Sequence, residues 1–213
     1  MEKLKLKSNT YPGKLIVFEG TDGAGKTTMI NLTKNFLREK IGEEKVVSVK
    51  QPTDMSRKTK LFQKMMYCKN HEDVDYRAVQ LLTMSDRIQH GSEIIIPALK
   101  EGKIVVCDRY IFTSLSNMLA RGYFKEKWFF DAAKNIVRPD ITFLAYTEPD
   151  IAIKRIKSRP EECDRFLDEK LLRNVSKIFY KMAKKEKFTI VDTSGDPETA
   201  FSVIKENLEK KVF

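Results

Sequence analysis

A glycine-rich loop that ends in lysine and threonine lies near the start of the chain, between an apolar segment and a helical one. The loop, residues 20–27, reads Gly-Thr-Asp-Gly-Ala-Gly-Lys-Thr and fits the pattern G-x-x-x-x-G-K-[ST]. Residues 15–19 are Leu-Ile-Val-Phe-Glu, as in a buried strand, and residues 26–40 have helical periodicity. Inward-pointing N–H groups of such a loop, and the first turn of the helix after it, bind phosphate. The sequence therefore predicts a phosphate-binding loop, or P-loop.

The same strand-then-helix order repeats along the chain. Short apolar runs predict further strands at 46–49, 104–108, 141–146 and 188–192. Apolar residues at helical spacing predict helices at 74–100, with Gly91 and Pro97 as bends or ends, and at 129–137, 151–156, 171–183 and 199–208. This alternation predicts an α/β fold with a five-stranded parallel sheet of the P-loop NTPase type, helices on both of its faces and a short lid segment. Ligands are then expected beyond the carboxyl ends of the strands.

Length and composition limit the organisation of the chain. Its 213 residues fit one domain, predicted as 14–213, and the lysine-rich residues 1–13 are expected to form a flexible tail. No apolar run approaches the roughly 18 residues of a membrane span, so we expect a cytoplasmic protein without membrane contact. The three cysteines, Cys68, Cys107 and Cys163, are expected to be reduced thiols. The formal charge of +10 favours anionic ligands.

Three parts of the sequence indicate phosphoryl transfer. Lys26 is expected to reach the β- and γ-phosphates, and the Thr27 hydroxyl to bind Mg²⁺. Asp108 ends an apolar strand, as a second Mg²⁺-associated acid does beside a P-loop, and Arg109 follows it with a fixed fork of donors. A basic segment at about 157–166 is predicted to be a lid whose arginines, Arg159 and Arg165, close over the phosphates.

With these motifs in order, the chain resembles the thymidylate kinase family from about Lys14 to the C-terminus. Asp22 inside the P-loop resembles the acid of the family's first motif, and Gln51-Pro52 resembles its Arg-Glu-Pro segment. The run 85–90, Ser-Asp-Arg-Ile-Gln-His, resembles its base-reading helix, and Asp108-Arg109-Tyr110 with Thr113-Ser114 resembles its Asp-Arg-Tyr/His motif. Tyr180, Ala183 and Asp192 also fall where the family has them.

The resemblance implies an ATP- and Mg²⁺-dependent kinase that converts dTMP to dTDP, with Arg87 at the thymine base, Arg109 at the acceptor phosphate and Asp22 near the sugar 3′-hydroxyl. Gly23 in the loop, together with lid arginines, resembles the bacterial type and implies a homodimer. The expected site residues are these: catalytic, Lys26, Arg109, Arg159 and Arg165; ATP-binding, Gly20, Thr21, Asp22, Gly23, Ala24, Gly25, Lys26, Thr27 and Thr28; substrate-binding, Asp22, Lys50, Gln51, Thr83, Arg87, Arg109, Ser114 and Asn117; metal-binding, Thr27 and Asp108.

Three departures from the family pattern concern the acceptor pocket. Thr83 stands where the family has a phenylalanine that stacks on thymine, Lys50-Gln51 replaces Arg-Glu, and Asn117-Met118 replaces Tyr-Gln. They keep open a kinase of the same fold that acts on another nucleotide, a nucleoside or a small metabolite. A nucleotide switch or nucleic-acid-associated module is a further alternative, suggested by the basic charge and opposed by the lid arginines and the Asp-Arg-Tyr motif.

Overall fold

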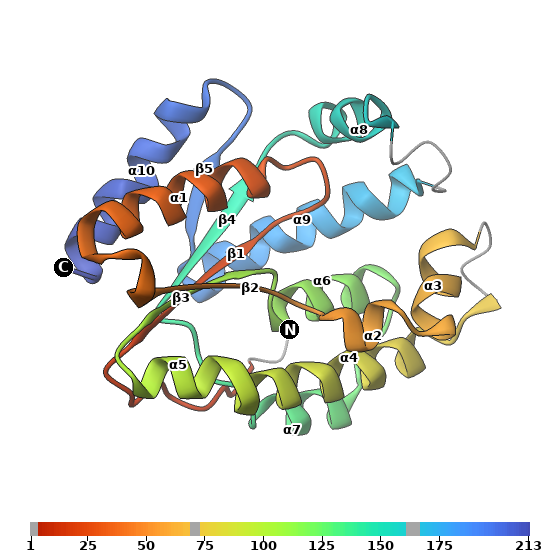
Figure 1. Cartoon of the computed structure of the whole chain (residues 1–213). Coiled ribbons are helices and arrows are strands. Elements are labelled where there is room, and N and C mark those ends of the chain that lie inside the picture. The colour runs from red at the N-terminus through yellow and green to blue at the C-terminus, as the bar shows by residue number, and fades with distance from the viewer. Residues whose placement is uncertain (1–3, 69–72, 161–166) are drawn as a thin grey trace.

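The computed structural model describes residues 4–68, 73–160 and 167–213. Five parallel strands form one sheet in the order β2-β3-β1-β4-β5. Their bounds are β1 Lys14–Glu19, β2 Val46–Lys50, β3 Ile104–Asp108, β4 Ile141–Tyr146 and β5 Thr189–Asp192. All five lie where the sequence predicted them, and the parallel α/β sheet is confirmed (Figure 1).

Helices cover both faces of the sheet because successive strand residues alternate between two apolar clusters. Ile16 and Phe18 of β1 face α1 (Lys26–Ile41) and α10 (Pro197–Lys211). Leu15 and Val17 face the opposite cluster. Its helices are α4 (Tyr76–His90), α5 (Ile96–Lys100), α6 (Ile111–Ala120), α7 (Lys127–Ala133) and α9 (Glu169–Glu186). Figure 1 shows α1 and α10 above the sheet and α4, α5 and α7 below it.

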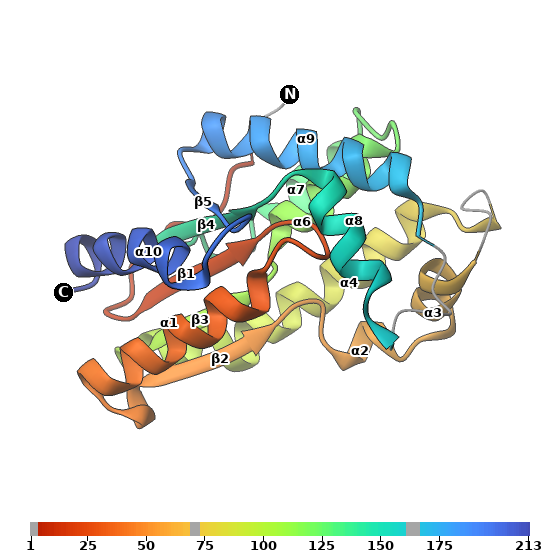
Figure 2. The ribbon, with the colours of Figure 1, turned by 90° about the horizontal axis from the view of Figure 1, so that it is seen from above.

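The carboxyl ends of β1, β2 and β3 point toward the same side of the molecule, on the right in Figure 1. The P-loop leaves β1 there, and β2 leads into two short helices, α2 (Asp54–Arg57) and α3 (Lys60–Tyr67). Helix α8 (Pro149–Lys157) packs beside the start of α9 at the same end, as Figure 2 shows from above. These segments frame the crevice where the fold class places its ligands.

The predicted helix at 74–100 is helical throughout, but it is divided. A π-helical turn, Gly91–Ile95, joins α4 to α5, so Gly91 does not end the helix. Pro97 lies in the first turn of α5, where a missing N–H costs little. Helices α2, α3 and α6 were not predicted. Among the described residues, no helix is long and apolar enough to cross a membrane.

Residues 4–13 are packed against the domain, so the prediction of a flexible tail was wrong for them. Leu4 and Leu6 are buried in the cluster below the sheet, while Lys5 and Lys7, which alternate with them, are exposed. Lys7 forms a parallel bridge with Val137, in which its N–H donates to the Ile136 carbonyl at 2.9 Å. The helix predicted at 129–137 ends at Ala133, and residues 136–137 pair with this N-terminal segment instead of continuing it.

We predict that Leu6→Ala lowers the free energy of unfolding by about 2 kcal/mol or more, because it removes a packed leucine side chain. Lys5→Ala, which truncates the neighbouring exposed side chain, should change it by less than about 0.5 kcal/mol. Urea unfolding of the two variants and the wild type measures both. Equal values for the two variants would show that this segment adds nothing to the core.

Candidate active site

The P-loop connects β1 to α1 and presents the start of that helix to the crevice. Gly25 immediately precedes α1 with φ of 75°, in the left-handed region that favours glycine. The first turn of α1 contains no acidic residue and no side-chain cap. Its unpaired N–H groups and positive dipole end therefore remain available to an anion.

Gly23 makes the closest approach of the loop to its surroundings. Its φ is 75°, and a Cβ atom at this position would lie 2.3 Å from the carbonyl oxygen of Ala152 in α8. Arg155 of α8 also donates a hydrogen bond to the Gly23 carbonyl at 3.4 Å and another to the Thr193 carbonyl at 2.9 Å. A side chain at position 23 thus has no room, so an arginine that contacts phosphates bound by the P-loop must come from another part of the chain.

Lys26 is almost fully buried at the first position of α1. Its Nζ donates a hydrogen bond to the Thr21 carbonyl at 2.6 Å. The pKa of Lys26 is lowered to about 7, first by burial and next by the nearby charge of Arg109, while Asp22 and Asp108 oppose the shift. A bound phosphate would supply the negative charge that favours the protonated amine.

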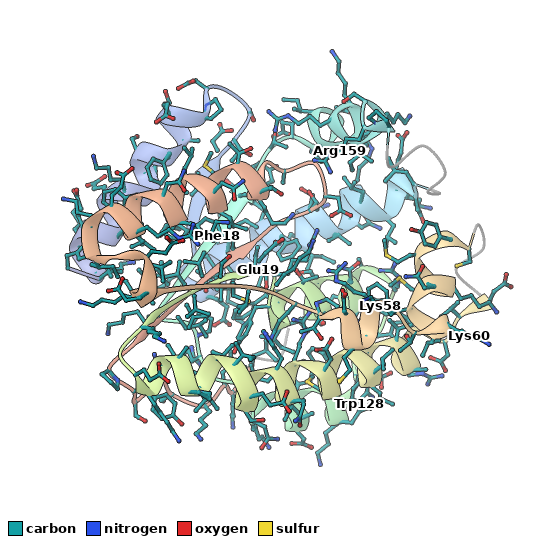
Figure 3. The ribbon with its side chains drawn as sticks, viewed as in Figure 1. Phe18, Glu19, Lys58, Lys60, Trp128 and Arg159 are labelled. Atoms are coloured by element: carbon teal, nitrogen blue, oxygen red, sulfur yellow. The ribbon has the colours of Figure 1, made fainter. Side chains whose placement is uncertain are left out.

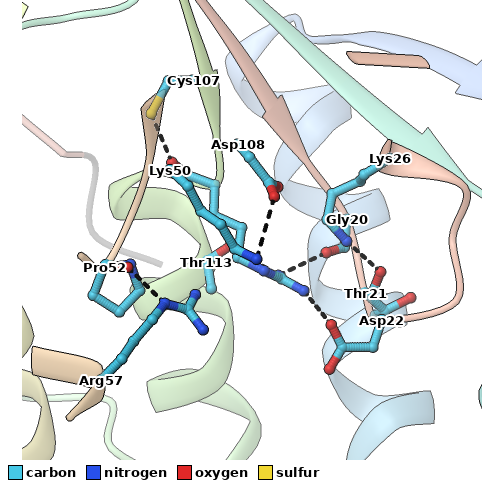
Figure 4. A network of polar contacts seen from close by, with 11 residues as sticks. Gly20, Thr21, Asp22, Lys26, Lys50, Pro52, Arg57, Cys107, Asp108 and Thr113 are labelled. Atoms are coloured by element: carbon cyan, nitrogen blue, oxygen red, sulfur yellow. Dashed lines mark hydrogen bonds and ion pairs between the residues drawn. The ribbon is translucent and has the colours of Figure 1, made fainter. Parts of the chain in front are cut away.

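Arg109 links the end of β3 to the P-loop, whose Gly20 and Asp22 are labelled in Figure 4. It has a left-handed backbone with φ of 64°, and its N–H donates to the Phe18 carbonyl at 2.9 Å. The guanidinium group forms an ion pair with Asp22 and donates to the Gly20 carbonyl at 3.0 Å. These contacts bring together two residues that the sequence predicted to meet the same acceptor.

Asp108, at the end of β3, has the features of a metal ligand. Its Oδ1 atom is buried without a hydrogen-bond partner, and its Oδ2 atom lies 3.9 Å from Nζ of Lys50. An orphaned carboxylate oxygen beside a P-loop fits a cation held jointly with phosphate oxygens. Within the described residues, no group of three or more His, Cys, Asp or Glu side chains forms a metal site by itself.

Glu19, which the sequence analysis missed, is fully buried at the end of β1. Its carboxyl group accepts hydrogen bonds from the Tyr110 N–H at 3.0 Å, from the Thr113 N–H at 3.1 Å and from the Thr113 hydroxyl. Burial raises its pKa to about 7, against the lowering effects of Thr113, Arg87 and Arg109. The sequence did contain a signal for this residue, because Glu19 is a single acidic residue at the end of an otherwise apolar strand, directly before the P-loop.

Arg87 of α4 is buried and held from two sides. It donates to Oε1 of Gln51 at 2.8 Å and to Oγ of Ser114 at 3.3 Å. Gln51 in turn lies 3.0 Å from Nδ1 of His90 and is completely buried behind Arg87. Gln51 does not line the cavity, so its predicted direct contact with the substrate is replaced by a supporting one. The sequence placed Gln51 at the ligand because residues directly after parallel strands usually face the ligand crevice.

The wall where the family's aromatic ring is expected carries polar side chains. Thr83 is buried, and its hydroxyl lies 3.3 Å from Oε1 of Gln80. Nearby, the guanidinium of Arg121 lies 4.1 Å from the ring centre of Tyr76 and donates to Oδ1 of Asn117 at 2.8 Å. Position 83 thus has no aromatic ring, and the sequence analysis did not identify the Tyr76–Arg121 pair nearby.

A cavity of about 440 Å³ joins these groups. Basic side chains outnumber acidic ones among its described lining residues; the basic ones are Lys26, Lys50, Arg57, Arg87, Arg109, Arg121 and Arg159, and the acidic ones are Asp22, Asp108 and Asp168. Residues of α3 and α9 supply apolar walls, among them Phe62, Met65, Val175 and Phe179. The cavity therefore suits a ligand with a strongly anionic part and an apolar or aromatic part.

The two lid arginines are not equally placed. Arg159 follows α8 and lines the cavity, and Figure 3 shows it beside that helix. Arg165 lies outside the described residues. Thr27, Thr28, Lys50, Thr83, Ser114 and Asn117 line the cavity together with Arg159.

Comparison with known proteins gives one family. The sequence model of the thymidylate kinase family matches residues 18–204. The chain is 37% identical over 177 residues to the probable thymidylate kinase of Pyrococcus horikoshii, covering 81% of this chain and 83% of the relative. It is 31% identical over 207 residues to the thymidylate kinase of Limosilactobacillus reuteri, covering 93% and 97%. Its fold matches the crystal structure of thymidylate kinase from Ehrlichia chaffeensis with a TM-score of 0.68, 25% identity, and 92% and 98% coverage.

The raised pKa of Glu19 predicts a pH-dependent stability. The native state keeps the Glu19 proton up to about pH 7, whereas the unfolded chain releases it near the ordinary value of 4.5. The native state then binds more protons between these values, so this carboxyl lowers the free energy of unfolding as pH rises through that range. Denaturant unfolding from pH 4.5 to 7.5 should show a smaller decline for Glu19→Gln than for the wild type. Glu209→Gln, at an exposed site, should follow the wild type; a Glu19→Gln curve parallel to the wild type would contradict the shift.

Proposed function

The chain belongs to the thymidylate kinase family, and we propose that it transfers the γ-phosphoryl group of ATP to the 5′-phosphate of dTMP, which yields dTDP and ADP. The observation that supports this reaction most directly is one cavity lined by both the P-loop lysine, Lys26, and the Arg109–Asp22 pair. The first belongs to the phosphoryl donor and the second to the acceptor. Reaction between two bound anions requires this arrangement.

The donor side is formed by β1, the P-loop and α1. The loop N–H groups and the first turn of α1 bind the phosphates of ATP, and Lys26 moves from the Thr21 carbonyl to the β- and γ-phosphate oxygens. The tight packing of Gly23 against Ala152 keeps the loop in its cradle shape. Arg155 adds to this by holding the loop carbonyl toward α8.

A divalent cation, with Mg²⁺ as the proposed ion, is held through the Thr27 hydroxyl and the Asp108 carboxylate. The orphaned Oδ1 atom of Asp108 supports the assignment. When bound, the cation would offset the negative charge that the phosphates carry during transfer. Lys50 forms an ion pair with the other oxygen of Asp108, with Nζ 3.9 Å from Oδ2.

The acceptor occupies the space between α4, α6 and the Arg109–Asp22 pair. Arg109 contacts the 5′-phosphate, Asp22 the sugar 3′-hydroxyl, and Arg87 the base, with Thr83, Ser114 and Asn117 on the surrounding walls. An ionised oxygen of the acceptor phosphate is itself the nucleophile, so no general base is needed. The chain contributes alignment of the two phosphates and positive charge for the transition state.

Arg159 and Arg165 are proposed to close over the transferred group and to exclude water. The position of Arg159 on the cavity wall supports its part. Gly23 supports a source outside the P-loop, because the loop has no space for an arginine at that position.

A second acceptor remains a specific candidate because of the wall around Thr83. A threonine bonded to Gln80 leaves out the ring that would stack on thymine, a contribution of about 1 kcal/mol. A different nucleoside monophosphate would use the same phosphate groups and a different base contact.

The function is tested by ADP release from ATP and Mg²⁺ with dTMP, dUMP, dCMP, dGMP, dAMP, their ribonucleotide counterparts and thymidine as acceptors. We expect turnover to be greatest with dTMP and to stop when EDTA removes the metal. Lys26→Ala should lower kcat by about 100-fold or more with the fold intact, because it removes a charge from the transferred phosphates. Lys34→Ala, on the same helix, is the control. Activity confined to another acceptor would replace dTMP, and a fully active Lys26→Ala would exclude the P-loop mechanism.

We also propose a homodimer, formed through the outer face of α4. One stripe of this helix carries uncharged residues at helical spacing: Ala78, Leu81, Ser85, Ile88 and Ser92 of the following π turn. Leu81 is 56% exposed in the single chain, and Ile94 next to the stripe is 43% exposed. Self-association through a two-fold axis would cover both.

We predict that Leu81→Asp converts the dimer to a monomer, because it places a charge opposite its own copy near the axis. Light scattering coupled to gel filtration measures the mass. Leu81→Ala removes the side chain without adding charge and should weaken the dimer less. A wild-type protein that elutes as a monomer would refute the proposal.

A further inference from the structure

Arg57, at the end of α2, is a charged residue of the cavity wall with no assigned role. Its Nε donates to the Pro52 carbonyl at 2.7 Å, and its guanidinium lies 5.7 Å from the ring centre of Phe62. Neither terminal nitrogen has a hydrogen-bond or ion-pair partner within the described part of the chain. Figure 4 shows the group directed from Pro52 toward the space beside Lys50 and Thr113.

An anion would stabilise the positive charge of Arg57 in its partly buried surroundings. Burial lowers the pKa of Arg57, and the nearby positive charge of Arg109 lowers it next. Two guanidinium groups that share a partly buried cavity repel each other, and an anion between them would remove that cost. Asp108 and Asp22 oppose the shift only by their longer-range charge, since neither forms an ion pair with Arg57.

The position of Arg57 is fixed by contacts with α4 rather than by its own short helix. Asp86 accepts the Thr53 N–H at 2.7 Å and the Thr53 hydroxyl at 2.8 Å, and that hydroxyl caps α2 by accepting the Met55 N–H at 3.2 Å. Gln63 of α3 donates to the Arg57 carbonyl at 2.6 Å. The terminal nitrogens are therefore presented to the cavity before any ligand binds, which lowers the entropy cost of binding.

Lys50 does not supply the guanidinium group that the family pattern has at this position, and Arg57 can supply one. Lys50 stands in place of an arginine, and its ammonium group lies near Asp108. A lysine also offers a point charge where a guanidinium offers a planar pair of donors. Arg57 restores such a pair seven residues further along the chain.

We propose that Arg57 binds the 5′-phosphate of the acceptor nucleotide together with Arg109, as a second guanidinium fork. This inference rests on the proposed function, because it assigns a residue to the acceptor side of the same cavity. It makes Arg57 a determinant of the preference for a nucleoside monophosphate over the nucleoside. It also assigns Lys50 to Asp108 instead of to the acceptor.

The experiment compares dTMP and thymidine by calorimetry in the wild type, in Arg57→Gln and in Lys58→Gln. Loss of a charge-assisted, two-point contact should raise the Kd for dTMP roughly 10- to 100-fold. The Kd for thymidine, which has no phosphate, and the KM for ATP should stay within about 2-fold. Lys58→Gln removes an equal charge from the next residue, which is exposed and paired with Asp54, and should leave all three values unchanged.

Several results would overturn the assignment. Equal losses of dTMP and thymidine affinity would make Arg57 a structural residue, a raised KM for ATP would move it to the donor, and unchanged values would remove it from the site. If Arg57→Gln does not fold, Arg57→Lys keeps the charge and loses the fork, and it should still raise the Kd for dTMP alone. Binding is read without turnover, so a wild type that binds dTMP but does not phosphorylate it would refute the proposed reaction and still report on Arg57.

Discussion

The ion pair between Arg109 and Asp22 joins the two strands on which the cavity depends. Parallel pairing of β1 with β3 places Phe18 opposite Asp108, so the P-loop and the Arg109 turn leave the sheet at the same height. The left-handed backbone of Arg109 then directs its guanidinium back across β1 toward Gly20 and Asp22. Glu19 supports this turn from below through Tyr110 and Thr113. The geometry that brings the donor and acceptor together is therefore set in the sheet itself.

Around this pair the cavity accumulates positive charge in a setting that shields it from water. Lys26 and Arg57 both have lowered pKa values, for which burial is the first cause and the charge of Arg109 the next. These cations repel one another, and bound phosphate groups would relieve that repulsion.

The strands and the P-loop were predictable because each is defined by a local pattern: an apolar run, a glycine spacing, or a strand-terminal acid. The missed features depend on partners distant in sequence. Helices α2 and α3 are short and begin at threonine caps, and the cap of α2 is tied to Asp86 some thirty residues later. Gln51 follows a strand, as a ligand residue would, but Arg87 draws it inward. The N-terminal segment appeared to be a charged tail because lysines alternate with Leu4 and Leu6, although that two-residue period is also the pattern of an extended segment with one buried side.

The two hydrogen bonds that Thr53 donates to the Asp86 carboxylate couple two parts of the acceptor side mechanically. They fasten the segment that carries Arg57 to the helix that carries Thr83 and Arg87. The two parts must then shift as one body when α4 moves. A laboratory redesign of the base wall at Thr83 would inherit the phosphate contacts unchanged, provided that Asp86 is kept. The base preference could thus be altered while the phosphate contacts are kept, and the Asp86 carboxylate is the group that connects the two parts.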